Sequence, residues 1–457
     1  MSTEFHCAQA LLPDGWTDQV RIQVDPTGLI KSIEANQSPG PDAIRLGTVV
    51  PGMANLHSHA FQRAMAGLSE RRGPGADSFW SWRDVMYRFI DRLTPEAVEA
   101  IAALVQIEML EAGYTAVGEF HYLHHDQTGA AYDDPGEMGA RICAAAGRTG
   151  IALTLLPVFY RHAGFNDAPA SHGQRRFLND ADSFAALVEA ARKHVSALSH
   201  ARIGIAPHSL RAASMNDISA ILPLADGGPV HIHIAEQTGE VEACLAATGQ
   251  RPVRYLLDHQ PVDERWCLVH ATHMDTDETI ALAASSAVAG LCPLTEASLG
   301  DGLFPAVDYL AAKGRIGIGS DSHIRIDLAE EIRLLEYGQR LSRRARNVLA
   351  GTGASTGRTL FEACLSGGAQ ALAQPTGRLA PAQRADLVEL ETDHPVLAGR
   401  SGDTLLDSWL FAGDARQVRS VHVGGRCRVH AGQSLVRPEV ENAYRSALHS
   451  ILADETA

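Results

Sequence analysis

The two histidines of the segment His57-Ser58-His59 are the first residues whose types and spacing could do chemistry. They follow an apolar run from Leu46 to Met53. If this run is a β-strand, side chains alternate between its faces, so both imidazoles point the same way. They would form part of a catalytic zinc site, which needs three or four nitrogen, oxygen or sulfur ligands and one open position. By itself, such a pair is more often incidental than metal-binding.

Other reactive side chains follow apolar runs further along the chain. One run contains His233 and is followed by Glu236, the next contains His270 near its end, and Asp321 comes shortly after a run that ends at Gly319. If these runs are the strands of one parallel barrel, their carboxyl ends meet at one face of the molecule. The sequence therefore predicts that these residues converge.

Zinc-assisted hydrolysis gives each of these residues an expected role. Glu236 is the candidate proton shuttle, and His270 can hydrogen-bond to the attacking oxygen and the tetrahedral centre. The run Leu155–Phe159 has no lysine that could bridge two metals, so we expect one Zn²⁺, or another divalent metal, per subunit. The expected metal ligands are His57, His59, His233 and Asp321. Asp321 is also expected to assist catalysis.

The middle of the chain, residues 49–375, alternates apolar strand-like runs with helical patterns. Eight such runs with helices between them favour an α/β fold, a (β/α)8 TIM-like barrel, over an open sheet. No Gly-x-Gly-x-x-Gly follows the first run to support a nucleotide-binding sheet. The expected strands are 48–55, 115–120, 151–159, 203–206, 230–235, 267–271, 287–292 and 315–319.

The two ends of the chain are predicted to form a second, smaller unit. Residues 1–48 contain short strands and turns that are too few to bury a core alone, and residues 376–457 contain a matching β-rich stretch. We expect them to combine into a small β-sandwich domain with a closing helix over residues 436–454.

Composition limits the classes of partner and compartment. The net charge is −15 without a basic block, which argues against nucleic acid and anionic membranes as partners, although a pocket could still bind a small anion. The seven cysteines are scattered and never form Cys-x-x-Cys, a pattern typical of reduced thiols in a cytoplasmic protein. We expect no signal peptide and no membrane span.

Together these motifs resemble the amidohydrolase superfamily, in its deaminase branch. The resemblance covers almost the whole chain, through His57-x-His59, His233-x-x-Glu236, His270, Ser320-Asp321-Ser322 and Gly377–Leu387. It implies a barrel enzyme that uses one zinc to replace an amino or imino group with oxygen, and it implies a homodimer.

A closer resemblance lies in His57–Gly67 and Ser78–Tyr87. These segments are similar to family members that hydrolyse N-formimino-L-glutamate to N-formyl-L-glutamate and ammonia in histidine degradation. The two carboxylates of that substrate call for guanidinium partners. From its sequence position alone, Arg83 would be a surface residue. The resemblance places five residues on the substrate: Gln62, Arg83, Tyr122, His208 and Arg211.

Two alternative functions remain open at this point. The first is a deaminase of a guanine-like or other ring substrate, which an aromatic stacking wall would favour. The second is a catalytically silent barrel that binds a small ligand or a partner. Among the other histidines, His231 is expected to be a hydrogen-bonded interior residue, and His121, His124 and His125 are expected in an exposed loop.

Overall fold

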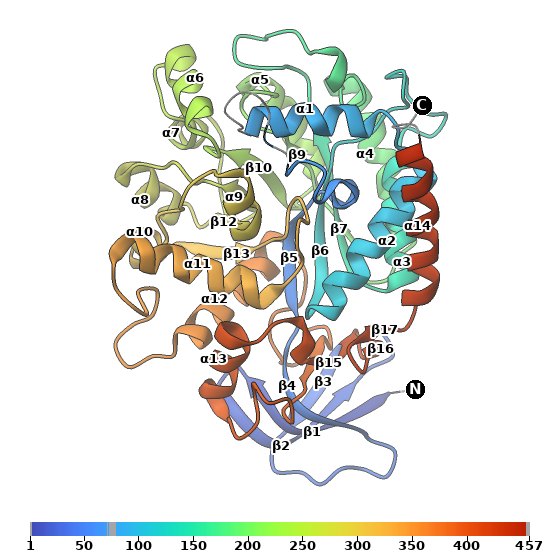
Figure 1. Cartoon of the computed structure of the whole chain (residues 1–457), viewed down its shortest axis with the longest axis vertical. Helices are drawn as coiled ribbons and strands as arrows, with labels where there is room; N and C mark the ends of the chain where they lie inside the picture. Colours follow the sequence, from blue (N-terminus) through green and yellow to red (C-terminus); the bar gives the residue numbers. More distant parts are fainter. Residues whose placement is uncertain (1, 71, 73–78, 454–457) are drawn as a thin grey trace.

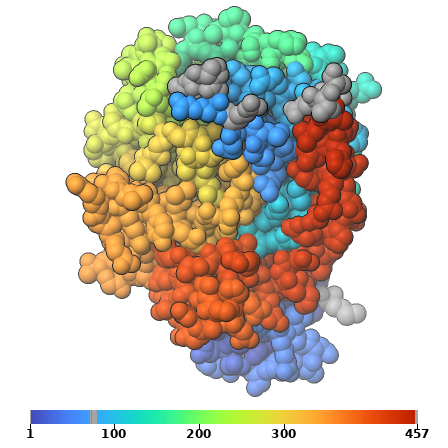
Figure 2. Space-filling view, viewed as in Figure 1, coloured from blue at the N-terminus to red at the C-terminus, as the bar shows by residue number. Residues whose placement is uncertain are grey.

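The computed structural model describes residues 2–70, 72 and 79–453. Ser78, which begins one of the motifs above, and residues 454–457 of the predicted small domain lie outside this range. Figure 1 shows a large α/β unit above a smaller β unit. In Figure 2 the blue N-terminal and orange-red C-terminal segments lie together at the lower end of the molecule.

The large unit is a closed parallel barrel, which confirms the predicted fold class. Parallel bridges join Ser58 to Asp321 and Ile205 to Val230, and so connect the two hydrogen-bonded halves. The barrel strands are β5 (Met53–Ser58), β6 (Tyr114–His121), β7 (Ala152–Phe159), β8 (Arg202–Ile203), β9 (Ala206–Pro207), β10 (Val230–Ile234), β11 (Trp266–His270), β12 (Val288–Leu291) and β13 (Arg315–Ile318).

Helices cover the barrel, and the last two of them follow strands of the small unit. All residues of β6 and β7 are buried, as expected for parallel strands that are covered on both faces. The helices are α1 (Phe79–Ile90), α2 (Pro95–Glu111), α3 (Glu137–Thr149), α4 (Ala181–Ser196), α5 (Met215–Ile221), α6 (Thr238–Thr248), α7 (Pro252–His259), α8 (Thr276–Ala284), α9 (Pro293–Leu299), α10 (Ala306–Ala311), α11 (Leu328–Arg343), α12 (Thr356–Ala371), α13 (Gly402–Ala412) and α14 (Arg437–Ala453). None of the helices described is long and apolar enough to cross a membrane.

The small unit combines both ends of the chain, as predicted. Its strands are hydrogen-bonded in the order β17-β16-β15-β14-β4-β1-β2-β3. Their bounds are β1 (Thr3–Leu12), β2 (Gly15–Val24), β3 (Ile30–Glu34), β4 (Ile44–Pro51), β14 (Leu387–Leu390), β15 (Val418–Val423), β16 (Arg426–His430) and β17 (Gln433–Ser434). The closing helix α14 runs beside α2 (Figure 1).

The boundary between the units differs from the single strand predicted over residues 48–55. The chain leaves β4 at Pro51, passes through Gly52 and enters β5 in the barrel. A Cβ on Gly52 would lie 2.3 Å from a methyl group of Thr115, so the side chain of Thr115 can pack this closely only against glycine. The apolar run therefore contains two strands that belong to two sheets.

Candidate metal centre and active site

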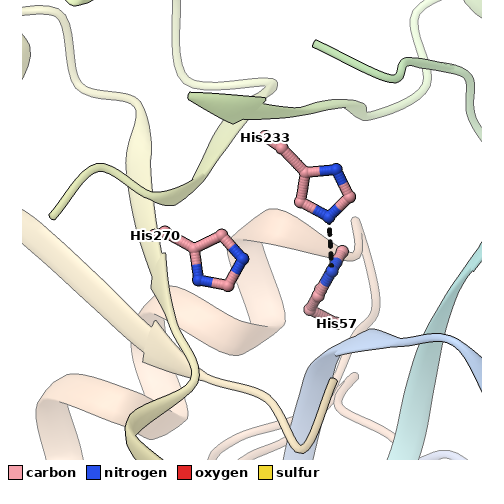
Figure 3. Close-up of side chains that lie close together, drawn as sticks. All are labelled: His57, His233 and His270. Carbon is pink, nitrogen blue, oxygen red and sulfur yellow. Dashed lines mark hydrogen bonds between the residues drawn. The ribbon is translucent and has the colours of Figure 1, made fainter. Parts of the chain in front are cut away.

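The predicted ligands come from three barrel strands and meet at the carboxyl ends of these strands. His57 lies in β5, His233 in β10 and Asp321 just after β13. His59 follows β5 by one residue, before the short 3-10 helix η1 (Ala60–Met65). Figure 3 shows His57, His233 and His270 facing one another. All five side chains are buried.

Their ligand atoms are spaced as a single metal ion requires. The Nε2 atom of His57 lies 3.1 Å from that of His59 and 2.9 Å from that of His233. Oδ1 of Asp321 lies 3.7 Å from His57 Nε2 and 3.4 Å from His59 Nε2. Ligands about 2.1 Å from a tetrahedral ion are separated by about 3.4 Å. The four side chains therefore form a His/Asp site that could hold one divalent cation.

Backbone carbonyls determine the tautomers of two of the histidines. Nδ1 of His59 donates to the carbonyl oxygen of Phe120 at 2.9 Å, and Nδ1 of His233 donates to that of His208 at 3.1 Å. Their Nε2 atoms therefore present lone pairs to each other. Burial lowers the pKa of His59 to about 3, so its ring is neutral at pH 7. Converging lone pairs repel each other unless a cation lies between them, so the donor set fits a metal.

His270 lies beside this cluster and contacts three carboxylates. Its Nδ1 is 3.2 Å from Oε1 of Glu296, and its Nε2 is 3.8 Å from Oε1 of Glu236 and 3.7 Å from Oδ2 of Asp321. Burial by itself lowers the pKa of His270, but the negative charge of these carboxylates outweighs burial and raises the pKa to about 10. In this environment His270 is a hydrogen-bond donor on both nitrogens.

The backbone at these strand ends is strained. His270, Asp321 and Ala235, which precedes Glu236, have φ values of 68°, 45° and 51°. Non-glycine residues seldom occupy this left-handed region, and such strain is common where side chains are held for function. These residues lie at or just after the ends of β10, β11 and β13.

One cavity connects the cluster with the residues predicted to bind substrate. It is lined by residues of the His/Asp site and by aromatic side chains. Several of the aromatic side chains come from α1, including Phe79, Trp82 and Tyr87. All five predicted substrate residues line it as well: Gln62, Arg83, Tyr122, His208 and Arg211. The view of Arg83 as a surface residue, drawn from its sequence position alone, is therefore wrong.

The two arginines of the cavity are not directly paired with an acidic group of the described residues, although the charges of Glu240 and Glu236 help to raise the pKa of Arg211 despite its burial. Arg83 and Arg211 form no ion pair with a described residue, and the Nε atom of each is buried without a hydrogen-bond partner. Both guanidinium groups lie over the ring of Trp80, at 4.6 and 5.6 Å from its centroid. Gln62 donates to the hydroxyl of Tyr122 at 2.7 Å, and its own side-chain oxygen is unpartnered. The cavity thus offers two guanidinium groups and one amide oxygen to a ligand.

Several residues of the site were missed or given no role by the sequence reasoning. Glu296 had no signal, because nothing in its local sequence marks it as the partner of His270. Glu119 and His323 were given no role, because their contacts with Ser58 depend on strands distant in sequence. The resemblance over Ser78–Tyr87, which places Arg83 on the substrate, was the sign of the contribution of α1.

The remaining histidine predictions have mixed outcomes. His231 is buried and its Nε2 lies 2.7 Å from the carbonyl oxygen of Ala371, which confirms an interior role. The expected exposed loop is wrong, because His121 and His124 are buried. Nε2 of His124 and His125 contact the carbonyl oxygens of Val158 and Leu178. These backbone partners lie far away in sequence, so the polar local sequence gave no sign that the segment is buried.

Comparisons with known proteins agree with this arrangement. Residues 48–428 match the Amidohydrolase family model, and residues 3–45 match the model "Formimidoylglutamate deiminase HutF, N-terminal domain". A formimidoylglutamate deiminase of Pseudomonas aeruginosa is 52% identical over 97% of this chain and 98% of its own length.

Solved structures show the same fold. An amidohydrolase from Brucella melitensis is 51% identical with a TM-score of 0.94, covering 98% of this chain and 100% of that chain. An adenosine deaminase from Xanthomonas campestris, solved with bound zinc, has a TM-score of 0.81 at 19% identity, covering 99% of this chain and 98% of that chain. This chain belongs to the amidohydrolase family.

Proposed function

We infer that this enzyme hydrolyses N-formimino-L-glutamate to N-formyl-L-glutamate and ammonia, a step of histidine degradation. The formimidoylglutamate deiminase that is 52% identical over nearly the full length of both chains supports this inference. The matching N-terminal domain model supports it independently of the barrel. The products require hydrolysis of a carbon–nitrogen bond that is not a peptide bond.

The structural observation that carries the proposal is the pair of unpaired arginines beside the His/Asp cluster. Buried guanidinium groups are normally matched with acidic groups. Arg83 and Arg211 form no ion pair with a described residue, although the charges of Glu240 and Glu236 act on Arg211, and both arginines line the same cavity as Asp321. A substrate with two carboxylates and a reactive formimino carbon would complete both halves of the site.

We propose that one Zn²⁺ is held by His57, His59, His233 and Asp321. When bound, zinc supplies a Lewis acid that lowers the pKa of water to near neutrality. The neutral imidazoles described above are the protonation state that such a metal needs. Metal analysis of purified protein, with the H57A/H59A variant as control, tests this ligand set.

Side chains of the protein carry out the proton transfers of the reaction. As the water oxygen bonds to the formimino carbon, Oε1 of Glu236 accepts a proton from it. The same carboxyl group gives this proton to the terminal nitrogen. Glu236 then accepts the remaining proton of the added oxygen and delivers it to the same nitrogen, which leaves as ammonia when its bond to carbon breaks. His270 donates a hydrogen bond from Nε2 to the oxygen on which negative charge develops. The carbonyl of the N-formyl product forms from that oxygen.

Gln62, Tyr122 and His208 line the cavity beside the arginines and would orient the glutamate portion of the substrate.

We propose that the enzyme acts as a homodimer in the cytoplasm, on a small anionic substrate, without nucleic acid or membrane as a partner. Light scattering after size-exclusion chromatography tests the dimer.

The decisive test is ammonia release from a matched set of substrates by metal-quantified protein. N-formimino-L-glutamate should be hydrolysed efficiently, and N-formiminoglycine, which lacks the side-chain carboxylate, should be hydrolysed at least tenfold less efficiently. Equal kcat/KM values for the two compounds would contradict a dicarboxylate site.

A ring deaminase remains the second candidate because of the aromatic lining. Tyr160 and Phe177 line the cavity with Trp82, and such rings could stack on a purine. Guanine belongs in the substrate panel for this reason. The two unpaired guanidinium groups favour the dicarboxylate, since an uncharged ring would leave both without a partner.

A further inference from the structure

A second cleft lies between the amino-terminal end of the barrel and the small β unit. It measures about 560 Å³. The barrel contributes the end of α3, the start of β7 and the segment after α4, and the small unit contributes the β15–β16 turn and Thr27. In Figure 1 the strands β15, β16 and β17 lie just below the lower end of α2, at this junction. No residue of this cleft belongs to the cavity described above.

The lining of this cleft is basic although the whole chain is acidic. Arg426, Arg428 and His200 line it, together with the hydroxyl-bearing residues Thr27 and Ser199, and its lining contains no aspartate or glutamate. The chain as a whole carries 54 acidic and 39 basic residues. We call this basic site the Arg428 cleft. A carboxylate-free basic cleft in a protein of net charge −15 is an unusual local arrangement.

Arg428 is held in place by the fold rather than by an ion pair. Its guanidinium carbon lies 2.2 Å from the position that a Cβ on Gly150 would occupy, so any larger residue there would displace it. Gly150 also needs its left-handed φ of 77° to end α3. The Nε atom of Arg428 is buried without a hydrogen-bond partner. Burial and the neighbouring Arg426 lower the pKa of Arg428.

Helix ends give only a partial explanation for these cations. The cleft lies at the carboxyl ends of α3 and α4, whose partial negative charge favours a nearby cation. However, in the described part of the chain the guanidinium groups of Arg426 and Arg428 donate to no carbonyl and pair with no carboxylate. Asp386, which is close enough to influence His200, is already paired with Arg384 at 2.7 Å. Two sets of charged donors therefore remain available to a ligand.

We propose that the Arg428 cleft binds a small oxyanion, a phosphate or a carboxylate, at a site separate from the catalytic centre. Guanidinium groups bind both anions through paired hydrogen bonds, and the hydroxyl of Ser199 can donate to the same oxygens. The catalytic cluster lies at the other end of β7, whose eight residues span roughly 25 Å at ~3.3 Å per residue. A bound anion would bridge the barrel and the small unit, and so stabilise their contact.

Isothermal titration calorimetry of the metal-loaded protein with inorganic phosphate, and separately with succinate, tests the proposal. Ionic strength is held constant with KCl. The variants are Arg428→Gln and Arg426→Gln, the second at an exposed position where folding should be unaffected. Arg416→Gln is the charge-matched control, because Arg416 is exposed and already paired with Asp414. Arg211→Met weakens anion binding at the catalytic cavity.

One or both anions should bind wild type and the Arg211→Met and Arg416→Gln variants with similar affinity. Loss of a charge-assisted hydrogen bond should weaken binding about tenfold or more in Arg428→Gln and Arg426→Gln. The stronger of the two titrations identifies the anion class. The proposal fails if neither anion binds saturably, if Arg211→Met alone abolishes binding, or if both cleft variants bind as wild type does.

Discussion

The hydroxyl of Ser58 donates a hydrogen bond to Oε2 of Glu119 on the neighbouring strand, and the other oxygen of Glu119 accepts from the backbone N–H of Ala60 at 2.8 Å. Ser58 also lies 3.0 Å from Nε2 of His323. Since Ser58 stands between His57 and His59, this buried network holds the segment that carries two proposed ligands.

Ser58→Ala should weaken metal binding without removing a ligand. It leaves one oxygen of Glu119 without its partner, at a cost of about 1–3 kcal/mol, and it releases the backbone between the two histidines. Loss of such supporting contacts typically lowers metal affinity by roughly 10–100-fold. Competition with a chelator, together with the melting temperature, measures both effects.

Thr149→Val is the matched control for this prediction. It removes a buried hydroxyl that donates to Gln106 at 2.9 Å, away from the proposed ligands. It should lower the melting temperature and leave zinc affinity unchanged. If both variants lose zinc equally, general destabilisation accounts for the loss and Ser58 has no specific role.

Glu236→Gln should reduce kcat by a factor of roughly 10²–10⁴ and leave the metal content at the wild-type level. The amide cannot accept the proton of the attacking water or deliver one to the departing nitrogen. Steady-state ammonia release and metal analysis of the same sample check this. A variant with normal turnover would assign the proton transfer to another group.

Arg83→Met and Arg211→Met should each raise KM for N-formimino-L-glutamate by about tenfold to a hundredfold, because each removes a charge-assisted contact to a carboxylate. Arg88→Met is the control, since Arg88 lies on the same helix as Arg83 but is exposed and does not line the cavity. Unchanged KM values in the two cavity variants would show that other residues bind the carboxylates.

We expect protonation of His422 to contribute to the loss of stability of the small β unit at acid pH. Burial, with a smaller contribution from His430, lowers the pKa of His422 from 6.5 to about 4. The unfolded chain therefore binds a proton that the folded chain excludes, so folding stability is full above pH 6.5 and falls as the pH drops toward 4. This difference corresponds to about 3 kcal/mol.

Replacing His422 with phenylalanine, which keeps an aromatic ring against Phe5, should make the loss of stability between pH 6.5 and pH 4 shallower. Urea unfolding at several pH values measures it. The variant His449→Phe, at an exposed position, should keep the slope of the wild-type protein. Identical slopes for all three proteins would mean that His422 takes no part in acid unfolding.

The sequence by itself was sufficient to predict the barrel, a small unit formed by both ends of the chain, and the convergence of His57, His59, His233 and Asp321. Alternating apolar runs and helices have few ways to bury their apolar surface, and parallel strands in a barrel bring their carboxyl ends together. The domain boundaries at 48/49 and 375/376 remain predictions. In the structure, the chain passes from the sheet of the small unit to the barrel at Gly52.

Only the tertiary structure decided which polar groups support the site. Glu296 contacts His270, Glu119 contacts Ser58, and Arg428 lies against Gly150, across separations of 26, 61 and 278 residues. No local pattern encodes such contacts, because their geometry depends on strand register and on helix ends that pack after the barrel closes. Residue type and order thus determined the reactive centre, whereas packing determined its supporting contacts and the second basic cleft.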